Sequence, residues 1–227
     1  MKSNFLQLYS DLNLQFKNEA LLQTAFTHRS YLNEVKEVNE SNERLEFLGD
    51  SVLSLIISSY IFGLKPKDNE GDLTNLRSYI VKTESLAEAA AKLNLGAYLR
   101  MSKGEELSNG RENTQLLANT YEALLGAVYL DLGEDATRKV IYQTLLPLFA
   151  SELENGPPKD AKSKLQEIVQ NNEKKSPHYK ILNTTGPDHS KTFIVGVFVN
   201  GVEKGVGTGK NKQEAEEAAA KEALIVY

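Results

Sequence analysis

The ten residues NERLEFLGDS, at positions 42–51, carry two overlapping helical patterns. Leu45, Leu48 and Val52 follow one another at intervals of three and four residues, which is the spacing of a single apolar helix face. The same spacing continues as far as Ile61. This stretch therefore predicts a long helix that packs one of its faces into a protein core.

The second pattern in this helix is a stripe of carboxylates. Glu43, Glu46 and Asp50 are three and four residues apart, so they lie along one side of the helix. Carboxylates this close repel one another when ionised, and a solvated acidic face is the usual interpretation. Here the flanking residues are too apolar for a freely solvated face. A hard divalent cation would relieve the repulsion, and oxygen ligands alone suit magnesium or manganese.

A second apolar helix with polar residues on one face is predicted at 116–131, LLANTYEALLGAVYLD. Asn119 and Glu122 are three residues apart, and both offer oxygen ligands. Gly49 and Gly126 lie inside the two helical patterns, where each glycine costs about 1 kcal/mol relative to alanine. Close approach of the two helices explains both glycines, and it would bring Asn119 and Glu122 to the acidic stripe.

A third acidic position, Glu70, lies in the segment KDNEGDL (67–73), in a turn just before another predicted helix. Taken alone, this segment is explained by capping or turn chemistry of Asn69 or Asp72. The spacing therefore does not indicate that Glu70 belongs to the same site as Glu46 and Asp50.

The chain offers no competing catalytic machinery. It contains no nucleophile triad and no Walker-type phosphate loop. The histidine of the FTHRS segment, His28, is interpreted as a structural residue between helices. Acidic residues with a divalent metal, without a covalent nucleophile, fit hydrolysis of a phosphodiester by metal-activated water.

The sequence changes character near residue 156. Residues 1–152 read as successive helices and predict an all-α domain. Gly156-Pro157-Pro158 cannot continue a helix, so a linker is placed at 153–160. Residues 161–227 predict a small α+β domain of order α-β-β-β-α. Its expected elements are a helix at 161–170, strands at 178–183, 191–200 and 202–207 with a hairpin turn at Asn200-Gly201, and a helix at 212–225.

Composition narrows the class of protein. The chain has 227 residues, which is enough for one large domain or two small ones, and with 41% hydrophobic residues it can build a core. It has no cysteine, which excludes disulfides and thiolate metal sites. No uninterrupted apolar run of about 18 residues and no signal-peptide pattern is present, which predicts a soluble, cytoplasmic protein without a membrane partner. The net charge of −5 hides an asymmetry, because the part from Lys159 onward has 11 lysines and 9 acidic residues.

With these motifs in place, the sequence resembles bacterial ribonuclease III along nearly its whole length. NERLEFLGDS matches the family signature, and the surrounding motifs keep the family's order: FTHRSYLNE (26–34), DNEGDLTNLR (68–77), LGAYLRMSKGEE (95–106) and NTYEALLGAVYLD (119–131). The C-terminal part is similar to a double-stranded-RNA-binding domain in KLQE (164–167), GPDHSKTF (186–193) and GTGKNKQEAEEAAA (207–220).

The resemblance implies a ribonuclease III fold for the first domain and a homodimer whose catalytic domains form a valley for an RNA duplex. Each protomer would cut one strand by magnesium-dependent hydrolysis, for which manganese can replace magnesium, and no organic cofactor is implied. The expected products carry 5′-phosphate and 3′-hydroxyl ends with two-nucleotide 3′ overhangs. The expected substrates are ribosomal RNA precursors and some messenger and transfer RNAs.

Motif matches also imply the residues of the site. The implied metal ligands and catalytic residues are Glu46, Asp50 and Glu122, with Glu43 and Glu70 as further catalytic acidic positions. Asn119 is interpreted as the fourth oxygen ligand, although many family members have Asp there. Asn keeps a carbonyl oxygen but removes a negative charge. This departure either weakens metal binding or is a natural variation with little effect.

The second domain is expected to read duplex RNA by shape, through 2′-hydroxyls and phosphates. The predicted contacts are Gln166 and Glu167 on its first helix, Pro187 and His189 in a loop between strands, and Lys210, Asn211 and Lys212 at the start of its last helix. A helix N-terminus favours phosphate. The family usually has Ser-Lys-Lys before this helix, whereas this chain has Asn211-Lys212-Gln213, and Lys210 is expected to substitute in part.

Two alternatives remain open at this point. One is a non-catalytic duplex-RNA-binding dimer on a nuclease-like fold, for which Asn119 is the only support. The other is a helical protein with an acidic surface and no affinity for RNA. For the dimer, Phe47, Leu48 and Leu53 are the candidate interface residues.

Overall fold

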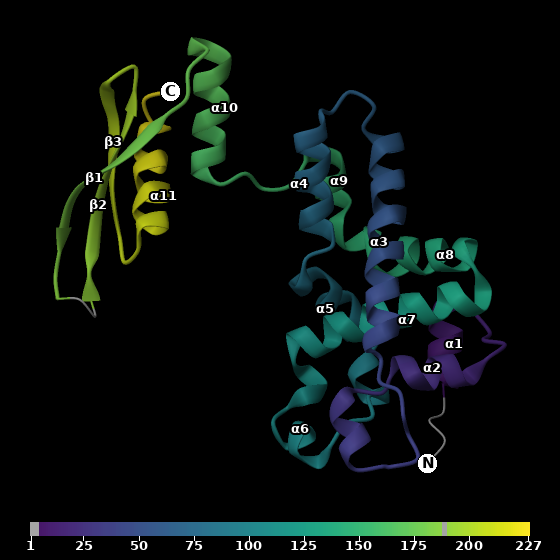
Figure 1. Cartoon of the computed structure of the whole chain (residues 1–227). Coiled ribbons are helices and arrows are strands. Elements are labelled where there is room, and N and C mark those ends of the chain that lie inside the picture. The colour runs from purple at the N-terminus through teal and green to yellow at the C-terminus, as the bar shows by residue number, and fades with distance from the viewer. Residues whose placement is uncertain (1–4, 188–189) are drawn as a thin grey trace. The chain divides into compact units, whose positions relative to one another are not determined.

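The structure is a computed structural model that describes residues 5–187 and 190–227 (Figure 1). The chain forms two compact units, 1–157 and 158–227. The division falls between Pro157 and Pro158, inside the predicted linker. Proline at both positions prevents a regular helix from running through the connection.

The first unit is helical, which confirms the predicted all-α domain. Its α-helices are α1 (Leu6–Leu12), α2 (Glu19–Ala25), α3 (Glu43–Leu64), α4 (Glu70–Ile80), α5 (Thr83–Lys92), α6 (Lys103–Leu107), α7 (Thr114–Leu132), α8 (Glu134–Thr144) and α9 (Ala150–Asn155). Short 3-10 helices lie at Arg29–Asn33, Leu95–Tyr98, Gly110–Glu112 and Leu146–Phe149. An isolated parallel bridge joins Thr27 and Arg100.

Helices α3 and α7 touch through their backbones. A Cβ atom built on Gly49 would lie 1.8 Å from the carbonyl oxygen of Glu122, and one on Gly126 would lie 2.2 Å from the carbonyl oxygen of Leu45. Neither distance leaves room for a methyl group. The close approach that was predicted from the two glycines is therefore confirmed.

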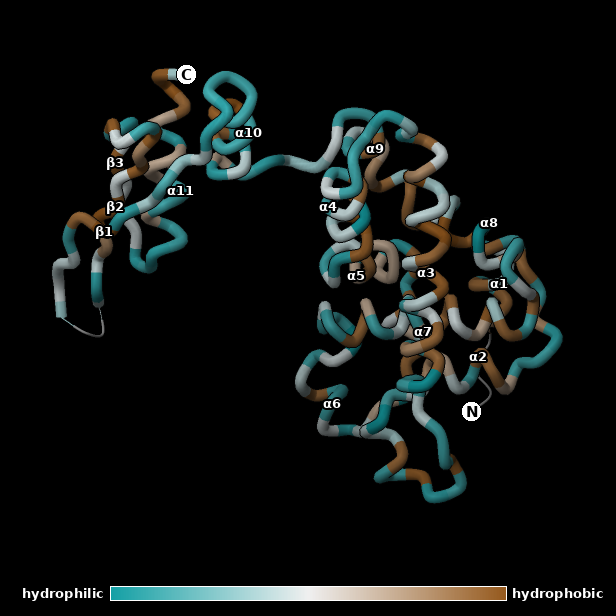
Figure 2. Tube along the Cα trace, turned by 45° about the horizontal axis from the view of Figure 1, so that its top comes forward, coloured by the Kyte–Doolittle hydropathy of each residue, from teal (hydrophilic) through white to brown (hydrophobic). Residues whose placement is uncertain are grey.

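Helix α3 is long and apolar enough to cross a membrane by length and composition alone, and Figure 2 shows its hydrophobic stretches in brown. It passes this test, although no uninterrupted run of that length occurs, because its polar residues are few and mostly small. In the structure its apolar face belongs to the core of the first unit, where the buried residues of α3 are Leu45, Val52, Leu53, Ile56, Ile57 and Ile61. Of the most apolar window of this helix 33% is buried, and Phe47, Leu55 and Phe62 are exposed.

The structure corrects one of the predicted interface residues. Leu53 is fully buried, because it lies one turn after Gly49 on the face that packs against the rest of the unit. Leu48 is partly buried against the same core. Phe47, in contrast, is 78% exposed and points away from the core.

The linker also begins later than predicted. Residues 153–155 belong to α9, and Leu153 is buried in the core of the first unit. Burial of this side chain keeps the helix intact until Gly156, where φ is +81°. The predicted boundary at residue 153 is therefore three residues too early.

The second unit has the predicted α-β-β-β-α order. Its elements are α10 (Ala161–Glu173), β1 (His178–Thr185), β2 (Thr192–Val199), β3 (Val202–Gly209) and α11 (Lys212–Ala223). The strands form an antiparallel sheet in the order β1-β2-β3. Asn200 and Gly201 both have positive φ, as a two-residue hairpin turn requires. The core residues from all layers are Ala161, Leu165, Val169, Val197, Val199, Ala219, Ala220 and Ala223.

The contact between α3 and α7 gives a first prediction about stability. Gly49→Ala should lower the free energy of unfolding of the helical unit by about 1–3 kcal/mol, because the new methyl group overlaps the backbone of α7. Urea unfolding followed by circular dichroism measures this change. The matched control is Gly63→Ala in the same helix, where nothing lies within 4 Å of the new Cβ. Equal stability of the two variants would contradict the packing.

Candidate active site and RNA-binding surface

The contact between α3 and α7 places four polar side chains at one junction. Glu46 and Asp50 come from α3, and Asn119 and Glu122 come from α7. The carbonyl group of Glu122 is the group that Gly49 touches. The structure therefore brings together the residues that the sequence predicts as metal ligands, and their function as ligands stays a prediction.

Burial and the repulsion of neighbouring charges raise the pKa values of two carboxyl groups at this junction, Glu122 and Glu46. Burial raises the pKa of Glu122 to about 7, with the charges of Asp50 and Glu46 contributing in the same direction. The pKa of Glu46 is also raised, first by burial and then by the charges of Glu43 and Asp50. The charges of Glu46, Asp50 and Glu122 thus act on one another. A cation bound beside them would stabilise their ionised forms.

The donor set fits a hard divalent ion in chemistry, since it consists of oxygen donors with excess negative charge. Among residues 5–187 and 190–227, however, no group of three or more His, Cys, Asp or Glu side chains is arranged to hold a metal. The carboxylates repel one another electrostatically, and their oxygens do not converge on one point, as expected for like charges. Binding an ion there would require them to turn inward.

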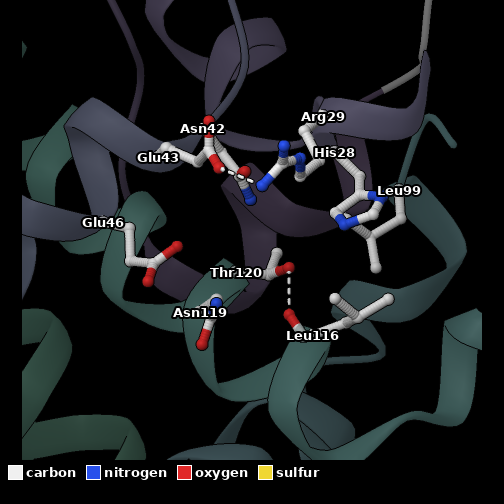
Figure 3. A pocket seen from close by; sticks show the side chains of 9 residues that line it. All are labelled: His28, Arg29, Asn42, Glu43, Glu46, Leu99, Leu116, Asn119 and Thr120. Atoms are coloured by element: carbon white, nitrogen blue, oxygen red, sulfur yellow. Dashed lines mark hydrogen bonds and ion pairs between the residues drawn. The ribbon is translucent and has the colours of Figure 1, made fainter. Parts of the chain in front are cut away.

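Asn119 is oriented by its neighbour one turn earlier. Gln115 Nε2 donates a hydrogen bond of 2.6 Å to Asn119 Oδ1. The nitrogen of the Asn119 amide points towards the side of the pocket where Glu46 lies (Figure 3), and this interaction lowers the pKa of Glu46. In this orientation the amide oxygen faces Gln115. Asn119 could act as an oxygen ligand only after its amide turns over.

A pocket of ≈ 210 Å³ lies beside the cluster (Figure 3). Its lining residues are His28, Arg29, Asn42, Glu43, Glu46, Leu99, Leu116, Asn119 and Thr120. Glu46 and Asn119 form one side, and His28 and Arg29 lie across from them. The pocket thus combines the acidic side of the junction with a cationic one.

Glu43 faces this pocket but is engaged elsewhere. Its Oε1 atom pairs with Arg29 Nη1 at 3.4 Å, and its Oε2 atom accepts a hydrogen bond of 2.9 Å from Ser41 Oγ. Glu43 acts on Glu46 through its charge. Glu43 thus forms an exposed ion pair with Arg29, and its catalytic assignment stays a prediction.

His28 has a more defined position than the sequence suggested. Its Nδ1 atom lies 2.8 Å from Ser30 Oγ and accepts a bond from the Ser30 N–H. Ser30 Oγ in turn accepts from the N–H of Ser102. In the tautomer whose Nδ1 atom accepts, the ring hydrogen lies on Nε2. These contacts fit the predicted structural role of His28, which stays a prediction, and His28 also lines the pocket.

Glu70 is not brought into the cluster. It begins α4, and its Oε1 atom accepts a hydrogen bond of 3.1 Å from Thr74 Oγ1. Asn69 caps this helix by accepting from the N–H of Asp72, as the turn interpretation predicted. The catalytic assignment of Glu70 stays a prediction that rests on the resemblance alone.

In the second unit, the first and last helices meet at a larger hollow of ≈ 710 Å³. Its lining residues are Asp160, Lys162, Ser163, Gln166, Asn211, Gln213, Glu214 and Glu217. Two predicted RNA contacts, Gln166 and Asn211, are thereby brought together. Lys210 and Lys212 are exposed beside them.

Two of the predicted RNA contacts, Asn211 and Glu167, form hydrogen bonds or ion pairs within the protein. Asn211 caps α11 by accepting from the N–H of Glu214 at 2.9 Å, and its amide nitrogen donates to Glu214 Oε1 at 2.8 Å. Glu167 pairs with Lys159 at 2.5 Å. Pro187 is exposed, and His189 lies outside the described residues.

Sequence reasoning did not single out two residues of the first unit, Arg29 and Gln115. Arg29 follows the histidine of FTHRS, so the motif contained a signal for it. Gln115 lies four residues before Asn119, which is the distance at which helical side chains meet. Nothing in the pattern distinguished this glutamine from other exposed polar residues.

Each of the two units matches a known protein family or motif. Residues 18–148 match the family profile described as Ribonuclease-III-like, and residues 161–227 match the double-stranded RNA binding motif. Ribonuclease 3 of Caldanaerobacter subterraneus is 46% identical over 96% of this chain and 95% of its own. Ribonuclease 3 of Geobacillus kaustophilus is 44% identical over 98% of this chain and 91% of its own.

Solved structures give the same result for the helical unit. The nuclease domain of ribonuclease III from Campylobacter jejuni is 38% identical, with a TM-score of 0.61, and the match covers 65% of this chain and 99% of that chain. In that nuclease domain, a region involved in dimer formation is structurally flexible. A second structure of the domain has a TM-score of 0.60 at 39% identity, over 66% of this chain and 97% of that chain.

A helical nuclease unit with an acidic junction, joined to a double-stranded-RNA-binding motif, defines an endoribonuclease that carries its own RNA-binding domain. The extent of the matches makes the particular family plain. The chain belongs to the ribonuclease III family. The helical protein without RNA affinity is thereby excluded.

The raised pKa of Glu122 predicts a pH-dependent stability in EDTA. Because the folded pKa of about 7 lies above the ordinary 4.5, this group stabilises the fold fully below about pH 4.5 and loses that contribution as the pH rises through 7. Glu122→Gln removes the charge and should stabilise the protein at pH 8 by about 1–2 kcal/mol, after a discount for solvent screening. At pH 5 the gain should be much smaller.

Thermal unfolding at the two pH values measures this difference. Glu112→Gln is the matched control, because Glu112 is exposed and lies before α7. The same pH dependence in both variants would show that the pKa of Glu122 is not raised by its position.

Proposed function

We propose that this chain hydrolyses phosphodiester bonds in both strands of double-stranded RNA with the help of Mg²⁺. The observation that carries the proposal is the coupled cluster of Glu46, Asp50 and Glu122 at the contact between α3 and α7. A backbone contact fixes the two helices, so the three carboxylates stay together despite their repulsion. Acid groups held this close together could bind a cation once their side chains turn towards it.

In this proposal Glu46, Asp50 and Glu122 hold the ion, and Mn²⁺ can replace Mg²⁺. When bound, the ion supplies Lewis-acid polarisation of the phosphate and a lower pKa for water. Glu122 must release its proton before it can bind, because its pKa is about 7. Metal affinity should therefore rise with pH around neutrality.

The opposite side of the pocket would contact the RNA. The Arg29 guanidinium is held by Glu43, and both line the pocket next to Glu46. A guanidinium in this position can bind a phosphate of the strand being cut. This gives Glu43 a part in catalysis as the residue that positions Arg29.

The second unit would deliver the duplex. Gln166 is exposed on α10, where an amide can reach a minor-groove hydroxyl, and Lys210 and Lys212 are exposed at the start of α11. Lysines at that end place positive charge where phosphates of a duplex pass. Because Asn211 caps α11, the two lysines supply more of the phosphate contact than the amide does.

A homodimer is proposed from the surface of α3. Phe47, Leu55 and Phe62 are 78%, 62% and 73% exposed, and their spacing places them along one side of the helix. Burying this apolar stripe against a second copy would pair two active sites. Attack of water on phosphorus with the 3′-oxygen leaving would give 5′-phosphate and 3′-hydroxyl ends, and two cuts offset between the strands would give the two-nucleotide 3′ overhangs.

The setting of this activity is proposed to be the cytoplasm, where ribosomal RNA precursors and some messenger and transfer RNAs would be the substrates. The absence of cysteine suits a reducing compartment. The non-catalytic alternative is supported by Asn119, which lacks the negative charge of an acid. Three carboxylates remain beside it, so cleavage is the function that the site supports better.

Cleavage of a labelled duplex of about 40 base pairs, long enough for a domain that spans about 16, tests the proposal. The wild type should cut it with Mg²⁺ or Mn²⁺ and not with EDTA. Glu122→Gln should reduce the rate at least about 100-fold, because losing a metal ligand removes several kcal/mol of transition-state stabilisation. Sequencing of the product ends reads the overhang.

The control for this assay is Glu112→Gln, which removes an exposed carboxylate and should cleave at the wild-type rate. Cleavage in EDTA, or full activity of Glu122→Gln, would overturn the metal-dependent mechanism. Binding of the duplex without any cleavage, with activity gained by Asn119→Asp, would favour the non-catalytic alternative.

The dimer is tested by light scattering. The wild type should have twice the chain mass of 25.2 kDa, and Phe47→Asp combined with Phe62→Asp should shift it to the mass of one chain. Leu107→Asp is the matched control, because Leu107 is 87% exposed on α6 and lies off the stripe. A wild type of 25.2 kDa at micromolar concentration would contradict the dimer.

A further inference from the structure

The Asn119 side chain lies between two polar partners with different chemistry. On one side, Gln115 Nε2 donates to its Oδ1 atom at 2.6 Å. On the other side, its amide nitrogen points to the side of the pocket formed by Glu46 (Figure 3). Gln115 and Asn119 are four residues apart in α7, so their side chains meet on the helix surface.

The orientation of this pair follows from the acid at its end. An ionised Glu46 only accepts hydrogen bonds, so the amide facing it must present its N–H. The oxygen of Asn119 then faces Gln115, which must also present an N–H. One carboxylate thus sets the orientation of two amides in a row, and Gln115 secures the arrangement from the outer end.

We propose that Gln115 is a positioning residue for the metal site, which holds the Asn119 amide with its N–H aimed at Glu46. The inference rests on the proposed metal-dependent function and refines it. Asn119 then acts on the ion through Glu46, whose carboxylate it orients, and the oxygen ligands come from Glu46, Asp50 and Glu122. The Asn119 side chain needs Gln115 as well as Glu46, because its oxygen only accepts hydrogen bonds and its nitrogen only donates them.

This difference predicts a specific coupling. An aspartate has two equivalent oxygens, so its function does not depend on which way the group is turned. An asparagine in the wrong orientation would direct its oxygen at Glu46 and repel it. Gln115 should therefore matter when residue 119 is asparagine and should matter little in the Asn119→Asp variant.

The test measures Mn²⁺ affinity by isothermal titration calorimetry without RNA, for the wild type, Gln115→Met, Asn119→Asp and the double variant. Methionine has nearly the size of glutamine and no amide, and the charge is unchanged. Since Gln115 is exposed, the variant should fold normally, which thermal unfolding in EDTA checks. Gln7→Met is the matched control, because Gln7 makes a similar bond of 2.7 Å to Asp11, four residues later in α1.

Gln115→Met should weaken Mn²⁺ binding roughly threefold to tenfold, which is the range of one hydrogen bond to a group that orients a ligand. In the Asn119→Asp background the same change should alter affinity by less than about twofold. Gln7→Met should leave affinity unchanged.

Wild-type affinity in Gln115→Met, or an equal loss in both backgrounds, would overturn the positioning role while leaving the metal site intact. A wild type that binds no Mn²⁺ would overturn the proposed metal-dependent function and this inference with it. The two failures are therefore distinguished by the wild-type titration alone.

Discussion

The contact between the backbones of α3 and α7 is the constraint on which the rest of the first unit depends. Two glycines, Gly49 and Gly126, allow the helices to approach until side chains would no longer fit between them. Packing of the apolar faces supplies the energy that holds the helices there. The contact also fixes the positions of the polar helix faces. Glu122 therefore lies near the carboxylates of α3, although burial and the neighbouring charges both oppose its ionisation.

The carboxylates at the contact between α3 and α7 affect both the stability of the fold and the proposed binding of a metal ion. Like charges that the fold holds together destabilise the protein at a pH where they are ionised, and an ion that binds between them recovers that energy. The chain moderates the repulsion at one position by using the neutral Asn119 in place of a further acid. The neutral group then needs a fixed orientation, and Gln115 is placed to provide it.

The glycines, the apolar spacing and the carboxylate spacing were sufficient to predict the two central helices, their contact and the meeting of Glu46, Asp50, Asn119 and Glu122. These features are local or pairwise, so periodicity reveals them. The burial of Leu53 and the continuation of α9 through Leu153 could not be predicted, because both depend on what the rest of the unit packs against these residues. The pairing of Glu43 with Arg29 and the direction of the Asn119 amide depend on rotamers, which a sequence pattern does not contain.

The helix contact brings the partly buried Glu122 together with Glu46 and the exposed Asp50. A carbon-13 NMR titration of glutamate side chains in the metal-free protein, with Glu122→Gln used to assign the signal, measures this most directly. We expect a pKa of about 7 for Glu122, which falls when Mg²⁺ is added. An ordinary pKa near 4.5, unaffected by Mg²⁺, would contradict it.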